Sequence, residues 1–152
     1  MEALLLRHEP TGGWSYRRLI TGLGRETSPD GTVRRLVHLD AGDETHLVHS
    51  TSWRAVGDGR IVLTYLVHPD PDQHSPGTLL PGPLTIARSR RPGDPTPPDL
   101  EIGHVVAHAV RHLAFLGRTD PVVAAHLDAW PHTRRLLDAM PGMTAGELTP
   151  GR

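Results

Sequence analysis

The chain has 152 residues, a formal net charge of −1 at pH 7 and 37% hydrophobic residues. This length suits a single domain with a hydrophobic core of its own. The absence of cysteine excludes disulfides, iron–sulfur clusters, thiol catalysis and cysteine-based zinc sites, and the nearly balanced charge disfavours a nucleic-acid partner.

Two compositional features bear on function. The basic residues are all arginine, and asparagine is absent; together these indicate a GC-rich bacterial genome, so the arginines alone do not predict phosphate binding. The eleven histidines make the chain histidine-rich, and the charge of histidine changes near physiological pH. Near the start of the sequence the acidic Glu2 precedes a short apolar run, and no later run approaches the ~20 apolar residues of a membrane span. We therefore expect a cytoplasmic protein without a membrane segment.

Up to about residue 68 the sequence predicts strands. Short apolar runs alternate with turn sequences rich in glycine, aspartate and proline. The predicted strands span 4–7, 14–21, 33–39, 46–56 and 61–68, and the Asp58-Gly59 pair is a hairpin signal. In the fourth strand we expect the more apolar set to face the core, which comprises Leu47, His49, Thr51, Trp53 and Ala55.

Residues 69–98 are rich in proline, which predicts a long surface connection with one short strand at 84–88. The same stretch could instead be a lid. From Thr96 the apolar spacing becomes helical. We expect a first helix from about 99 to Gly117, a second from 120 to 129 and a third from 131 to 140.

These elements predict an α+β fold. An antiparallel sheet of five to six strands in the N-terminal two-thirds of the chain would pack against two to three C-terminal helices. The expected domain covers 1–143, with a strand meander at 1–68, the proline-rich wrap at 69–98 and helices at 99–140. We expect residues 144–152 to form a flexible tail.

The most informative motif lies in the first predicted helix. His104, His108 and His112 are spaced four residues apart and Glu101 precedes them by three, so all four share one flank of the helix, beside its apolar face. Groups at the edge of a packed face are partly desolvated yet accessible, as ligands and acid–base groups often are.

A metal is one interpretation of this stripe. His104 and His112 would lie ~12 Å apart along a helix, too far for one ion, but an i, i+4 pair can share one. His104 and His108 would then bind a divalent metal such as zinc, and His49 on the inward face of its strand would complete the site. The residue after His104 is valine rather than the glutamate of zinc proteases.

Other interpretations remain open. The histidines could simply bond neighbouring backbone or carboxylate groups, could act as acid–base or phosphate-facing groups, or could form an interface that responds to pH. The candidate catalytic residues are His49, His104, His108 and Glu101.

No motif in the sequence identifies a particular chemical reaction. Our leading hypothesis is therefore a small binding or accessory protein that interacts with another protein or with a second copy of itself. The alternative is a small metal-dependent or acid–base enzyme with its histidine cluster between the first C-terminal helix and the sheet.

Overall fold

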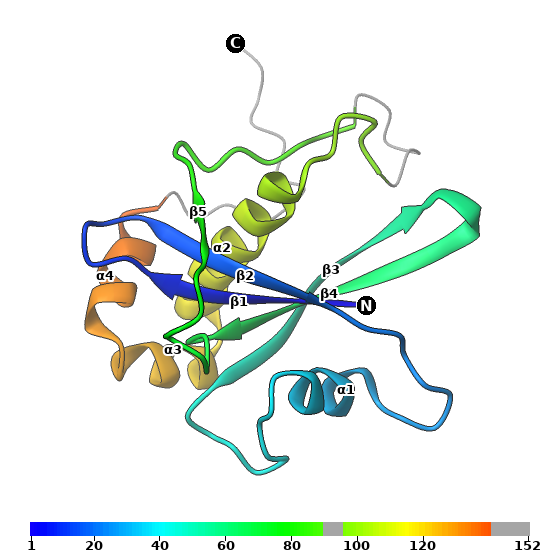
Figure 1. Cartoon of the computed structure of the whole chain (residues 1–152). Helices are drawn as coiled ribbons and strands as arrows, with labels where there is room; N and C mark the ends of the chain where they lie inside the picture. Colours follow the sequence, from blue (N-terminus) through cyan, green and yellow to red (C-terminus); the bar gives the residue numbers. More distant parts are fainter. Residues whose placement is uncertain (90–95, 141–152) are drawn as a thin grey trace.

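The computed structural model of the chain describes residues 1–89 and 96–140. A five-stranded sheet in the order β3-β4-β1-β2-β5 forms its centre (Figure 1). The strands are β1 (Glu2–His8), β2 (Trp14–Ile20), β3 (Leu47–Val56), β4 (Arg60–His68) and β5 (Thr78–Leu80). The helices are α1 (Pro29–Leu36), α2 (Ile102–Thr119), α3 (Pro121–Asp128) and α4 (Pro131–Asp138), with a short 3-10 turn at Gly57–Gly59. The predicted α+β class is confirmed.

The sheet is mixed rather than antiparallel as expected. β1 pairs with β4 in parallel, Glu2 opposite Thr64 and Leu4 opposite Leu66, while its other neighbour, β2, is antiparallel. The pairing joins strands that are far apart in the chain, and no turn sequence connects them directly. A prediction that pairs only strands adjacent in the sequence therefore misses the pairing of β1 with β4.

The predicted strand at 33–39 is also wrong, because this region forms α1. Ser28 caps the helix by accepting a hydrogen bond from the amide of Gly31, Pro29 occupies the first turn, and Asp30 adds an acidic side chain there. These residue types suit a turn and a helix start equally well. The described residues thus contain four helices, where two to three were expected.

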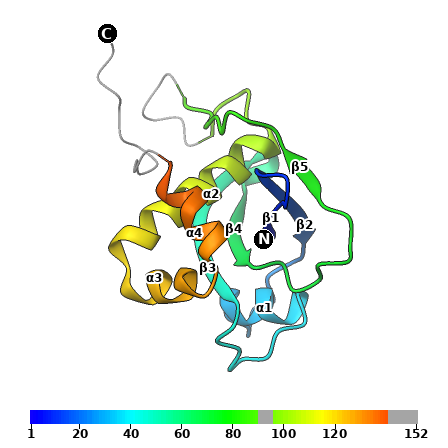
Figure 2. The same cartoon turned by 90° about the vertical axis from the view of Figure 1, so that its left-hand side faces the viewer.

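The sheet separates two hydrophobic clusters (Figure 2). One face, with Leu4, Leu6 and Leu66, packs against α2, α3 and α4. The other, with Leu5 and Val67, packs against α1. Since both faces of β1 are buried, its side chains are apolar on both sides, as is usual for a central strand.

A β-bulge divides β3 into two halves. The register against β4 shifts between Ser50 and Ser52, so residues beyond the bulge point to the opposite face from the one that simple alternation predicts. Leu47 packs against the helix-side cluster, whereas Trp53 is 58% exposed. The expectation that Trp53 belongs to the core is therefore wrong.

A buried carboxylate ties the strands together on the helix side. Glu2 of β1 is fully buried and accepts hydrogen bonds from Arg54 of β3 (2.9 Å to Oε2), Arg18 of β2 (2.7 Å) and Thr64 of β4 (2.7 Å). Burial raises the pKa of Glu2, but these hydrogen bonds and the charge of Arg54 outweigh it, so the pKa is lowered overall. A buried charge that is so fully partnered fixes the strand register.

The connection after β4 differs from its prediction. The short strand in this connection is β5 (Thr78–Leu80), whereas residues 84–88, where a strand was predicted, form no regular structure. Residues 141–152, including the expected tail, lie outside the described part of the chain. Within the described residues, no helix is both long and apolar enough to cross a membrane.

Candidate functional site

His49 of the sheet contacts His112 of α2, whereas His104 and His108 were the partners expected from the sequence. Their rings stack with centroids 5.5 Å apart, and His112 in turn lies 6.0 Å from His108. His49 comes from β3 before the bulge, so its side chain faces α2. The three imidazoles thus form a continuous row between the sheet and the helix.

The surroundings of these three histidines favour the neutral form of each imidazole ring. Burial, followed by the charges of His49 and His108, lowers the pKa of His112 to about 4. Burial also lowers the pKa of His108, and it lowers that of His49 against the opposing charge of Asp120. Neutral rings can donate one hydrogen bond and accept another.

His104 and Glu101 have a local partner instead. Nδ1 of His104 accepts a hydrogen bond from the backbone N–H of Glu101 at 3.1 Å, and the Glu101 carboxylate accepts the amide of His104 in return. This reciprocal capping box satisfies amides that the start of a helix leaves free. A structural role at the start of α2 therefore accounts for both side chains.

The metal interpretation gains no support. Among residues 1–89 and 96–140, no group of three or more histidine, aspartate, glutamate or cysteine side chains is arranged to hold a metal ion. The predicted ligands His49, His104 and His108 are not brought together around one point, because His104 is held in the cap.

Sequence reasoning missed a second histidine cluster, centred on His68. This side chain is only 1% exposed, at the end of β4. Its Nδ1 shares a hydrogen bond with Nε2 of His126 (3.0 Å), and its Nε2 lies 3.4 Å from the hydroxyl of Thr133. The Trp130 indole meets its ring edge-on at 5.6 Å between centroids.

The surroundings of His68 keep it neutral. Burial, together with the charges of His126 and His46, lowers the pKa of His68 to about 3. Burial and the charge of His46 likewise lower the pKa of His126, against a hydrogen bond with the His68 backbone. The sequence signal for His68 is its place at the end of an apolar strand, on the face shared with Thr64 and Leu66.

His46 lies on the loop before β3 and is oriented by Asp43. The Asp43 carboxylate lies 3.1 Å from Nδ1 of His46 and also accepts the amides of Thr45 and His46. Burial raises the pKa of Asp43, but the hydrogen bonds from His46 and Thr45 prevail and bring the pKa to about 2. This carboxylate is therefore ionised throughout the physiological range.

An open groove of about 960 Å³ runs between this loop, β3 and α3. Its walls carry the acidic side chains Asp43, Glu44 and Asp120, with Arg34 as the basic one. The apolar part includes Val122, which is 72% exposed, and Trp130, which is 39% exposed. Imidazoles of His46, His49 and His126 complete the lining.

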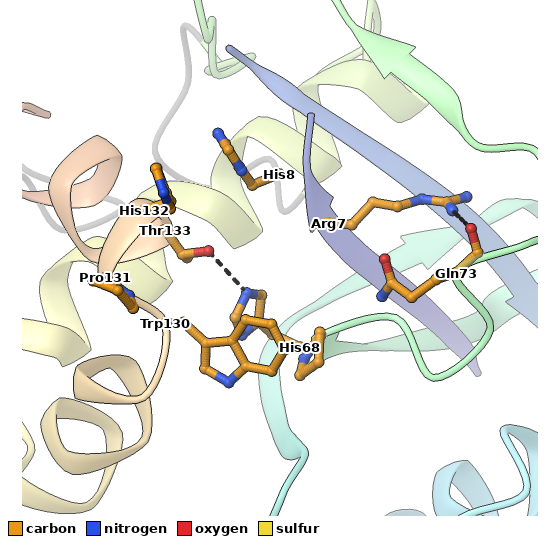
Figure 3. A pocket seen from close by; sticks show the side chains of 9 residues that line it. Arg7, His8, His68, Gln73, Trp130, Pro131, His132 and Thr133 are labelled. Atoms are coloured by element: carbon orange, nitrogen blue, oxygen red, sulfur yellow. Dashed lines mark hydrogen bonds between the residues drawn. The ribbon is translucent and has the colours of Figure 1, made fainter. Parts of the chain in front are cut away.

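A smaller pocket of about 210 Å³ opens where the ends of β1 and β4 meet the start of α4 (Figure 3). Its side chains include His8, His68, Trp130, His132 and Thr133. Arg7, Gln73 and two prolines, Pro69 and Pro131, complete the wall. Trp130 therefore borders both the pocket and the groove.

Comparison of the chain with protein-family models, with curated proteins and with solved structures gives no match.

Proposed function

We propose that the protein is a small binding protein whose groove between β3 and α3 holds a basic, partly apolar segment of a partner protein. The observation that carries this proposal is the combination of three carboxylates, Asp43, Glu44 and Asp120, with exposed apolar side chains in one open groove. A binding protein was the leading hypothesis from the sequence, and the groove supplies a surface with a defined chemistry.

The charge of the groove favours a basic partner. Arg34 donates to Asp30 at 3.0 Å and to the backbone oxygen of Asp43 at 3.2 Å, so its charge is directed at groups of its own chain. Glu44 is exposed and makes no ion pair within the described residues. Carboxylates that line a concave surface focus a negative potential and attract cations.

The apolar side of the groove favours a protein segment over a simple cation. Val122 is the most exposed large hydrophobic side chain of the described residues at 72%, and Trp130 also lines the groove. Binding removes the apolar surface of an indole from water, and the face of the ring attracts arginine or lysine. An amphipathic basic segment meets both requirements.

Fluorescence anisotropy with a labelled peptide of arginine, leucine and alanine at helical spacing tests the proposal. We expect saturable binding that weakens with salt, and no binding of the same peptide with glutamate in place of arginine. Glu44→Arg should weaken binding by roughly three- to tenfold, equivalent to about 0.7–1.4 kcal/mol.

Glu26→Arg is the matched control, because Glu26 is exposed and lies outside the groove lining. It makes the same change in net charge. Equal effects of the two variants would show that net charge alone attracts the peptide, and would overturn the proposal. Val122→Ser tests the apolar contact without changing the charge of the groove, and unchanged binding there would also contradict the proposal.

A further inference from the structure

The pocket at the start of α4 differs in charge from the groove. None of its lining residues, all of which belong to the described ranges, is acidic. The nearest buried carboxylate, Asp70, accepts two hydrogen bonds from Arg17 at 2.6 and 2.7 Å and lies 3.7 Å from Arg7. The negative charge of Asp70 is therefore already paired with arginine, and Asp70 is not among the residues that line the pocket.

His132 supplies a defined donor in this pocket. Nη2 of Arg135 lies 2.9 Å from Nδ1 of His132, and because a guanidinium can only donate, Nδ1 is the acceptor. The ring proton of the neutral His132 is then on Nε2. Arg135 makes no ion pair within the described part of the chain, so a positive charge stands beside the pocket without a carboxylate partner.

Further polar groups line this pocket, and Thr133 among them is buried. The His8 ring stacks on His132 with centroids 5.8 Å apart and planes 13° apart, and the Thr133 hydroxyl adds a further polar group. Trp130 is the N-cap of α4, and its side chain accepts no hydrogen bond from the first amides of that helix. The weakly positive end of the helix dipole therefore lies at this wall of the pocket.

The shape of the pocket selects a flat ligand. Figure 3 shows the Trp130 indole on one side and the His8 and His132 rings on another, and prolines add two more rigid rings. An apolar cavity of about 150 Å³ holds benzene. A volume of about 210 Å³ therefore has room for one ring with one small charged substituent.

We infer that this pocket is a binding site for a small aromatic or heteroaromatic carboxylate. The ring lies against Trp130, and the carboxylate accepts hydrogen bonds from Nε2 of His132 and from Thr133 near the charge of Arg135. This site is separate from the proposed peptide groove, and its ligand has the opposite charge.

Titration of the whole protein with benzoate, followed by NMR of the Trp130 indole N–H, tests the inference. Benzyl alcohol and benzylamine have the same ring without the negative charge, and acetate has the charge without the ring. We expect benzoate to bind at least about tenfold more tightly than each of the three.

Variants locate the site. His132 is exposed, so His132→Ala should fold normally, and we expect it to weaken benzoate binding at least about fivefold. Trp130→Ala should weaken it as well, whereas the controls His74→Ala and Trp53→Ala should not. Absence of saturable binding, equal binding of benzylamine, or unchanged binding in His132→Ala would each overturn the inference.

Discussion

Acidification should destabilise the protein through His68. Its pKa is about 3 in the folded protein and about 6.5 in an unfolded chain. Between these values the unfolded state binds a proton that the folded state does not, so stability is fully present above pH 6.5 and falls as the pH falls below it. The groups that face His68 are His126 from α3, His46 from the loop before β3, and Thr133 from α4.

The magnitude follows from the difference in pKa. Each pH unit in this window is worth about 1.36 kcal/mol for one group. At pH 5, which is about 1.5 units below the unfolded pKa, His68 alone lowers the free energy of unfolding by about 2 kcal/mol. A typical domain has only about 5–15 kcal/mol in total, so this loss is easily measured.

Urea unfolding at pH 7.5 and pH 5 provides the assay, with His68→Gln as the variant that cannot take up the proton. The wild-type protein should lose about 2 kcal/mol more than the variant over this range. His74→Gln serves as control, because His74 is exposed, and it should behave as the wild type. An equal loss in the wild type and in His68→Gln would refute the reasoning, as would an NMR titration in which His68 becomes protonated near pH 6.

Three further predictions concern stability. Glu2→Gln removes the charge that binds Arg54 and should cost about 3–5 kcal/mol in urea unfolding, because it leaves a partly buried cation without its partner; a loss below about 1 kcal/mol would speak against that network. Trp53→Ser should lower the free energy of unfolding by less than about 1 kcal/mol, since the indole lies largely in solvent. A loss as large as that of a buried aromatic side chain would mean that Trp53 belongs to the core. Gly117→Ala should lower the melting temperature and cost about 1–3 kcal/mol, because the new methyl group would come within 2.7 Å of Leu127 Cδ1 in the core; an unchanged melting curve would show that the core can yield there.

The sequence was sufficient to locate most elements because their signals are local. The strands near 4–7, 14–21, 46–56 and 61–68 and the C-terminal helices all appear within a few residues of their predicted ranges. Caps and turns such as Asp120 at the start of α3 act through adjacent residues. Local signals of this kind can be read in a single chain.

What could not be predicted depends on contacts between distant residues. The parallel pairing of β1 with β4 and the bulge in β3 are set by packing, and the bulge alone reversed the expected direction of Trp53. In the same way, the rotation of α2 against the sheet decides that His49 meets His112 while His104 stays in its cap. The cluster around His68 and His126 needs α3 to dock on the end of β4, which no spacing in the sequence reveals.

The indole of Trp130 is a wall common to both cavities. A ligand that binds in one cavity and moves this indole also changes the shape of the other cavity. The two binding events are then coupled. Thermodynamics makes any such effect reciprocal, so each guest alters the affinity of the other by the same factor. If both proposed ligands bind, this single side chain at the start of a short helix would couple two ligands of opposite charge.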